Sequence, residues 1–249
     1  METNAQIKLQ LKSLRLKSMY ENIDRLIDEA IDTKQSYGDF LLMLTRNELD
    51  SRQNSKRELN LKKSNMGRIK RIEEFDFNFN PVINRQQVLK LMSCDFIKNS
   101  ENVLIAGPTG VGKTFIAKAI GFEAVQKGYT VLFTRTNKML EDIFAGKADN
   151  TFNKRLTGYV KPDLLILDDW GMIEFGEKML HILNELISER YENGAIIITS
   201  NRPLENWDEL FPEKVIGSAL LDRILNQSHK MIIAGKSYRT GGKTLKINE

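Results

Sequence analysis

The fold is decided by the stretch Gly107-Pro108-Thr109-Gly110-Val111-Gly112-Lys113-Thr114. It follows an apolar run at residues 103–106 and precedes a helical pattern that begins at Phe115. This order predicts a buried strand, a glycine-rich turn and a helix N-terminus, where backbone N–H groups can hold the phosphates of a nucleotide. Lys113 is expected to reach the β- and γ-phosphates, and the Thr114 hydroxyl to bind Mg²⁺. A strand before the loop and a helix after it argue against a chance match, and we include Phe115 among the nucleotide-binding residues.

A second apolar run, at residues 163–169, ends in two carboxylates. Asp168 is placed at the end of the predicted strand, where it can hold Mg²⁺, an ion that prefers oxygen ligands and keeps several waters. Asp169 is then the candidate to polarise an attacking water. Paired acids after a strand can also simply begin a loop or cap a helix. The phosphate loop one crossover upstream favours the functional interpretation.

Composition sets the class of protein. The chain has 249 residues, of which 41% are hydrophobic and 28% charged, enough for a sizeable core in one large domain or two smaller ones. The single cysteine, Cys94, has no disulfide partner, and the two histidines, His181 and His229, are far apart and do not indicate a metal site. No apolar stretch approaches membrane-spanning length, and the N-terminus has no signal-peptide form. We therefore expect no membrane association and a reducing cytoplasm as the location.

Positive charge is concentrated in two zones of the sequence. The formal net charge is +4, but basic residues dominate residues 52–71 and again residues 223–246, which include Lys243 and Lys246. Two basic zones around a nucleotide site suit a polyanion such as nucleic acid. A solvated basic linker is the alternative that charge alone leaves open.

Residues 5 to about 65 are predicted to be helical, with a break at residues 35–38 and either Ser36 or Asp39 capping the second helix. A boundary at residues 65–67 divides the chain into an N-terminal helical domain, 1–66, and a nucleotide-binding domain, 67–249. Alternating aromatics at residues 75–79 predict a short extended segment with one buried side. Core packing is the favoured interpretation of that segment, and a base-stacking surface is the alternative. Residues 85–97 are predicted to form a helix.

The rest of the chain alternates strands with helices. Strands are expected at residues 129–134, 164–168 and 195–201, and helices at 137–146, 150–160, 178–191 and 218–224. Alternation at these lengths predicts an α/β fold with a parallel sheet flanked by helices on both faces. The carboxyl ends of such strands line the ligand crevice.

Two further residues are candidates for the catalytic machinery. Asn201 follows a buried strand, where its amide can orient the lytic water, although asparagine is also common in turns. Arg223 lies on a mostly apolar helix and can neutralise charge in the transition state from a neighbouring subunit. A salt bridge or a DNA contact explains Arg223 equally well on sequence grounds.

Taken together, the motifs at residues 107–114, 164–171, 198–201, 221–223 and 237–239 resemble those of the initiator-clade AAA+ ATPases. More narrowly, the chain resembles the DnaC-like helicase loaders and the IstB transposition helpers of bacterial insertion sequences. Residues 14–19 and 75–79 are most similar to the IstB group. The similarity covers nearly the whole chain, and the ordered set of motifs is far more specific than the phosphate loop alone.

The resemblance implies a P-loop AAA+ core that binds ATP and Mg²⁺ and forms a homo-oligomer on double-stranded DNA. It also implies a partner, the transposase of the same element, which stimulates ATP hydrolysis while the oligomer delivers target DNA. A replicative helicase loader that prefers single-stranded DNA is the alternative function.

By the same matching, Asn201 corresponds to the sensor-one residue, Arg223 to an intersubunit arginine finger and Arg239, more weakly, to a second sensor. Many family members carry Asp-Glu where this chain has Asp168-Asp169, so slow basal hydrolysis is expected. The family's extra helix would fall within residues 137–160, with DNA contacts expected from Lys147, Lys154 and Arg155.

Overall fold

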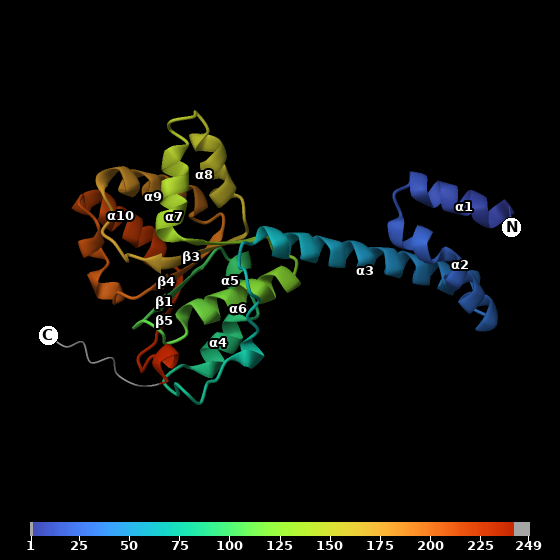
Figure 1. Cartoon of the computed structure of the whole chain (residues 1–249), viewed down its shortest axis with the longest axis horizontal. Helices are drawn as coiled ribbons and strands as arrows, with labels where there is room; N and C mark the ends of the chain where they lie inside the picture. Colours follow the sequence, from blue (N-terminus) through green and yellow to red (C-terminus); the bar gives the residue numbers. More distant parts are fainter. Residues whose placement is uncertain (1, 242–249) are drawn as a thin grey trace. The chain divides into compact units, whose positions relative to one another are not determined.

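The computed structural model describes residues 2–241, so Lys243 and Lys246 lie outside the described residues. The chain divides into two compact units, Met1–Leu59 and a second that begins at Asn60 (Figure 1). Within residues 2–241, no helix combines the length and apolar character needed to cross a bilayer.

The first unit is built from three helices: α1 (Glu2–Ser13), α2 (Lys17–Asp32) and the N-terminal part of α3 (Tyr37–Lys63). Its small core contains Met19, Ile23 and Leu26, whose helical spacing places them on one face of α2, and Leu44 from α3. The sequence pattern predicted one helix where the structure has α1 and α2, which are separated at Arg15, a residue with a left-handed φ of 57°.

Ser36 caps α3. Its hydroxyl accepts a hydrogen bond from the Asp39 N–H at 3.2 Å and donates one to the Asp39 carboxylate at 2.6 Å. This reciprocal pair resembles a capping box, which satisfies an N–H group that the helix itself leaves unpaired. Of the two caps considered from the sequence, the structure selects Ser36.

The last turn of α3 belongs to the second unit. The Asn60 amide donates to the Tyr129 carbonyl at 3.4 Å, and Lys118 Nζ donates to the Met66 carbonyl at 2.7 Å. The division between the units therefore lies between Leu59 and Asn60, and not after Met66 as expected from the sequence. Polar side chains in this turn gave no signal of burial, because their partners lie far away in the chain.

The second unit contains a five-stranded parallel sheet in the order β2-β3-β4-β1-β5. Its strands are β1 (Asn102–Ala106), β2 (Val131–Arg135), β3 (Leu164–Trp170), β4 (Ala195–Ser200) and β5 (Ser228–Ile232). β5 was not predicted, because an edge strand with the sequence Ser-His-Lys-Met-Ile has little apolar alternation.

Segment 64–65 covers the other edge of the sheet. The Phe133 N–H of β2 donates to the Ser64 carbonyl at 2.7 Å, and the Asn65 amide donates to the Phe133 carbonyl at 3.3 Å. Both outward backbone groups of Phe133 are thereby paired.

Helices cover both faces of the sheet, as predicted for an α/β fold (Figure 1). Val103 and Ile105 face one core with α4 (Arg85–Leu91), α5 (Asp95–Lys98) and α6 (Lys113–Gln126). Leu104 points to the opposite core, which is covered by α7 (Thr136–Ala145), α8 (Phe152–Val160), α9 (Glu177–Arg190) and α10 (Lys214–Leu225). Successive side chains of β1 therefore point alternately into two separate hydrophobic cores, one on each face of the sheet.

Two segments of the second unit that precede β1 differ from the sequence prediction. The helix expected over residues 85–97 is broken into α4 and α5, because Cys94 adopts a left-handed φ of 61°. Residues 75–81 form turns and not an extended segment, since the Asp76 carboxylate accepts the N–H groups of Asn78 and Phe79 at 2.9 and 3.3 Å. Phe75 and Phe77 nevertheless pack against the core, which agrees with the favoured interpretation of these aromatics.

Four short 3₁₀ turns complete the described elements: Ile72–Glu74, Leu204–Asn206, Asp208–Leu210 and Tyr238–Thr240.

Candidate nucleotide site

The phosphate loop joins the end of β1, an interior strand between β4 and β5, to the start of α6. Its Gly107 N–H donates to the Ser200 carbonyl of β4 at 3.1 Å. A Cβ atom at Gly107 would lie 2.0 Å from the Ile233 carbonyl oxygen, and one at Gly112 would lie 2.7 Å from the Phe75 ring. Both positions also have positive φ, so only glycine lets the loop pass this close to its neighbours.

The ammonium group of Lys113 makes three hydrogen bonds within the site. Its Nζ donates to the carbonyls of Gly107 and Pro108, each at 2.7 Å, and to Asn201 Oδ1 at 2.6 Å. The residue is only 7% exposed, and this burial lowers the pKa of Lys113 to about 8, even though the nearby carboxylates of Asp168 and Asp169 act to raise it. The loop lysine and the strand-end amide, which the sequence identified separately, therefore share a hydrogen bond.

Asp168 is the buried carboxylate at the end of β3. Thr114 Oγ1 donates to Asp168 Oδ1 at 2.8 Å, and the hydroxyl of Thr199 on β4 donates to the same oxygen. The Thr136 hydroxyl donates to the Asp168 carbonyl at 3.1 Å. Sequence analysis missed Thr199, whose only signal was a hydroxyl at the end of an otherwise apolar strand.

Asp169 is held in an unusual backbone conformation beside Asp168. Its φ is 58°, and the pairing of β3 with β4 shifts register between Leu167 and Trp170. The strand thus continues beyond its predicted end, with a bulge at the second carboxylate. Burial and the Asp168 charge raise the pKa of Asp169, while Arg135, whose Nε lies 3.6 Å from its carboxylate, acts in the opposite direction.

A cavity of about 510 Å³ runs along the phosphate loop. Lys113, Asp169 and Asn201 line it, together with further residues of the loop and of α6: Thr109, Gly110, Val111, Gly112, Thr114 and Lys118. Phe115, predicted as a contact, also lines it and packs 5.2 Å from the Phe75 ring centroid. Gly107 and Pro108 take part through their carbonyl groups, which bind Lys113.

The remaining walls come from two segments far apart in the sequence. Residues 70–80 contribute Lys70, Glu74, Phe75, Asp76, Phe79 and Asn80, and the C-terminal 3₁₀ turn contributes Tyr238 and the predicted Arg239. Sequence reasoning assigned the aromatics of residues 75–79 to the core and did not identify Phe79, Asn80 or Tyr238 as site residues.

Arg223, which was predicted as a catalytic residue, does not lie at the nucleotide site of its own chain. It lies on α10, where Nη1 donates to the Asn184 amide oxygen at 3.3 Å, and it does not line the cavity within the described part of the chain. No salt bridge to Arg223 is formed by residues 2–241.

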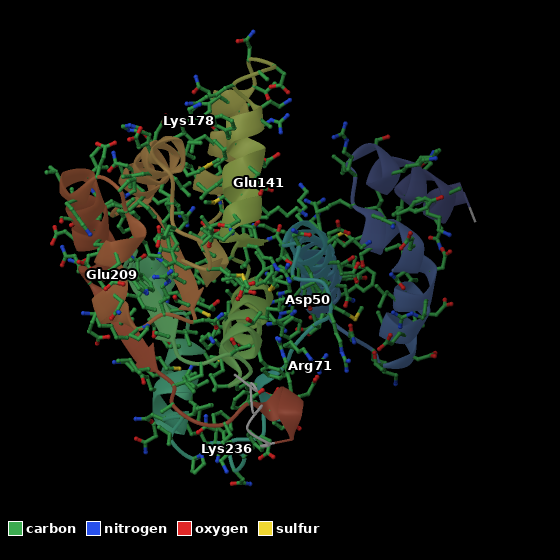
Figure 2. All side chains as sticks on the ribbon, turned by 60° about the vertical axis from the view of Figure 1, so that its left-hand side comes forward. Asp50, Arg71, Glu141, Lys178, Glu209 and Lys236 are labelled. Carbon is green, nitrogen blue, oxygen red and sulfur yellow. The ribbon has the colours of Figure 1, made fainter. Side chains whose placement is uncertain are left out.

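The three cations predicted to contact DNA differ in their surroundings. Arg155 is bound to two carboxylates of its own unit, Asp142 at 2.7 Å and Asp149 at 2.8 Å. Lys147 and Lys154 are exposed, and Lys147 Nζ lies 5.3 Å from the Phe152 ring centroid. Figure 2 shows a further exposed cation, Lys178, at the start of α9, where its Nζ lies 5.8 Å from the Phe144 ring of α7.

Comparison with known proteins agrees with this arrangement. Residues 9–245 match the family described as IstB-like ATP binding protein. Similar curated proteins include the insertion sequence IS232 putative ATP-binding protein of Bacillus thuringiensis subsp. berliner, 33% identical over 98% of this chain and 98% of that protein. Another is the insertion sequence IS21 putative ATP-binding protein of Pseudomonas aeruginosa, 33% identical over 94% of this chain and 88% of that protein.

Solved structures with the same fold include those of DnaI and the DnaC helicase loader. A structure titled as DnaI aligns with a TM-score of 0.58 at 21% identity, over 66% of this chain and 90% of that one. The DnaC helicase loader aligns with a TM-score of 0.51 at 19% identity, over 60% of this chain and 89% of that one. These likenesses show a P-loop AAA+ fold, as predicted.

Proposed function

Since the chain belongs to the family of IstB-like ATP binding proteins, we propose that it is an AAA+ ATPase that assembles with ATP on double-stranded DNA and assists the transposase of its own insertion sequence. In this role it would take part in target selection and DNA transposition. The observation that carries the proposal is the convergence of Lys113, Asp168 and Asn201 on one phosphate loop. These are the groups that phosphoryl transfer needs around a nucleotide.

The phosphates of ATP would lie against the loop N–H groups and Lys113. Mg²⁺ fits the Thr114 hydroxyl and the Asp168 carboxylate, two oxygen ligands that already lie 2.8 Å apart. When bound, the ion would neutralise charge on the β- and γ-phosphates. Asp169, at the bulge beside Asp168, is the residue proposed to polarise the attacking water, and Asn201 would orient that water.

Arg223 is proposed to act on the site of an adjoining copy. Its guanidinium donates to the neutral amide of Asn184, and Arg223 does not line the cavity within the described part of the chain. A site completed by the next subunit makes assembly depend on bound ATP. Arg239, which lines the cavity, is proposed as a second nucleotide-sensing residue within the same chain.

DNA contacts are proposed for three exposed lysines: Lys147 in the turn after α7, Lys154 on α8 and Lys178 on α9. Arg155 is a weaker candidate than the sequence indicated, because a DNA phosphate would have to compete with Asp142 and Asp149. Alignment of several copies would multiply these phosphate contacts, and such binding weakens steeply with salt.

Fluorescence anisotropy with labelled duplex DNA tests the proposal directly. We expect binding that requires ATP and Mg²⁺, is lost in Lys113→Ala and falls steeply between 50 and 200 mM salt, roughly as the number of phosphate contacts dictates. DNA binding that ignores both ATP and salt would overturn it. Incubation of the full chain with purified transposase or purified replicative helicase then identifies the partner, and stimulated ATP hydrolysis with the helicase alone would contradict the proposed partner.

A further inference from the structure

Several residues that line the cavity have no part in the proposed phosphate chemistry. Lys113 and Asn201 share a hydrogen bond at the phosphate loop, whereas Phe79, Asn80 and Tyr238 come from the two distant segments that also line the cavity. A nucleoside triphosphate is longer than its phosphates, so a protein that binds one must also accommodate the base and sugar. The inference below concerns that part of the ligand and rests on the proposed nucleotide binding.

Asn80 is a buried polar residue in the wall of this cavity. It is 5% exposed, and its Nδ2 donates to the Ala234 carbonyl at 2.7 Å. That bond orients the amide, because Nδ2 must face Ala234 and Oδ1 must take the other side. Among residues 2–241, no hydrogen bond reaches Oδ1, and this oxygen is not one of the fully buried side-chain atoms that lack a partner, so it keeps some accessible surface. An accessible acceptor whose orientation is fixed in this way can take a hydrogen bond from a ligand.

The aromatic pair beside Asn80 joins the two distant segments. The rings of Phe79 and Tyr238 meet edge to face, with centroids 4.8 Å apart. The Tyr238 N–H donates to the Gly110 carbonyl at 2.9 Å, which fixes this residue to the phosphate loop. Tyr238 remains 62% exposed, so its ring has free area for a flat partner.

We propose that Asn80 selects adenine over guanine by accepting a hydrogen bond from the exocyclic amino group of the base, with Phe79 and Tyr238 as the aromatic wall beside it. Adenine presents an amino donor at C6, where guanine presents a carbonyl acceptor. The Asn80 amide cannot turn over to suit guanine without losing its bond to Ala234. The same contact therefore secures the fold and sets the polarity of the pocket.

The test compares four ligands by isothermal titration calorimetry with the full chain and Mg²⁺: ATP, GTP, purine riboside triphosphate and inorganic tripolyphosphate. Purine riboside triphosphate lacks only the amino group, so we expect the wild-type protein to bind it roughly tenfold more weakly than ATP. Equal affinity for the two would overturn the proposal without any mutation. Tripolyphosphate reports the phosphate end alone.

Asn80→Ala supplies the second arm. We expect it to bind ATP and purine riboside triphosphate equally, with unchanged affinity for tripolyphosphate as the sign that the phosphate loop is intact. Tyr238→Ala should weaken the binding of ATP and GTP alike, and Tyr238→Phe, which keeps the aromatic ring, should weaken both less than Tyr238→Ala does. A preserved preference for ATP in Asn80→Ala would refute the role of Asn80 while leaving nucleotide binding in place. A wild-type protein that binds none of the three nucleotides would instead refute the proposed function.

Discussion

Thr114 Oγ1 donates a hydrogen bond of 2.8 Å to Asp168 Oδ1, which joins the first turn of α6 to the end of β3. The two side chains are proposed to hold one Mg²⁺, so their contributions should not be independent. We expect Thr114→Val and Asp168→Asn each to weaken Mg²⁺-dependent ATP binding, and the double variant to be little worse than the poorer single one. The coupling should be on the order of 1 kcal/mol or more, as for groups in direct contact. Titration with EDTA in place of Mg²⁺ is the control, and additive losses would contradict a shared ion.

Lys113 gives ATP binding a pH dependence. Its pKa in the free protein is lowered to about 8, and bound phosphate must raise that pKa, because the anion stabilises the protonated amine. ATP binding then takes up a proton above pH 8, and its affinity falls as the pH rises. We expect a loss of roughly tenfold between pH 7 and pH 9.

Lys113→Arg is the matched control for this effect, since a guanidinium keeps its charge throughout that range. Any affinity that the variant retains should be independent of pH. Calorimetry in two buffers with different ionisation enthalpies measures the proton uptake itself. A wild-type affinity that stays level from pH 7 to pH 9 would contradict the assignment.

Asp169→Asn separates binding from hydrolysis. Asparagine adopts the left-handed φ of 58° found at this position nearly as readily as aspartate, so the bulge should survive. We expect normal ATP affinity with turnover slowed by about a hundredfold or more, as for the loss of a general base. A steady-state phosphate-release assay measures it. Full turnover would show that another group activates the water.

Arg223 lends itself to a complementation experiment. We expect Arg223→Ala to reduce turnover by roughly a thousandfold when assayed alone, which is the scale of an arginine finger. When it is mixed with the impaired Asp169→Asn variant, activity should rise above that of either variant alone, because an intact site on one chain can then receive an intact Arg223 from its neighbour. An inactive mixture, with both variants still assembling on DNA, would exclude action between subunits.

The candidate DNA-binding cations, in the turn after α7 and on α8 and α9, fall into two classes with different expected phenotypes. Lys147→Ala, Lys154→Ala and Lys178→Ala should weaken DNA binding for any sequence and reduce the salt slope by about 0.9 per lost phosphate contact. Arg155→Ala should mainly lower the melting temperature, since it leaves Asp142 and Asp149 without their shared partner. Anisotropy and thermal unfolding together distinguish the two. An unchanged salt slope in all three lysine variants would place the DNA elsewhere.

Sequence reasoning succeeded where local chemistry determines the structure. The phosphate loop, its strand and its helix could be predicted because glycine spacing and apolar runs act within a few residues. The β3 carboxylates and Asn201 could be placed because parallel strands end at one edge of a sheet. Edge strand β5 was missed, since a half-exposed strand beside β1 needs little apolar periodicity.

The rest of the site depends on contacts between distant segments. Asn80 contacts Ala234, and Phe79 contacts Tyr238, although about 150 residues of sequence, including the whole sheet, separate the members of each pair. The hydrogen bond from Thr199 to Asp168 could not be predicted from the sequence, because it depends on β4 lying beside β3. The alternating aromatics at residues 75–79 indicated that one side of this segment is buried. They did not indicate that Phe75 and Phe79 would line the cavity. Such pairings are a property of the topology and leave no trace in a short window of sequence.

The covering of Phe133 by Ser64 and Asn65 has a consequence for a protein that we propose to assemble in many copies on one polymer. An edge strand with unpaired backbone groups can pair with the same strand of a neighbouring molecule, and molecules held close together would then aggregate irreversibly. Because the Ser64 carbonyl and the Asn65 amide already pair the outward groups of Phe133, association is left to side-chain surfaces, which in the proposed cycle can separate again after the triphosphate is hydrolysed.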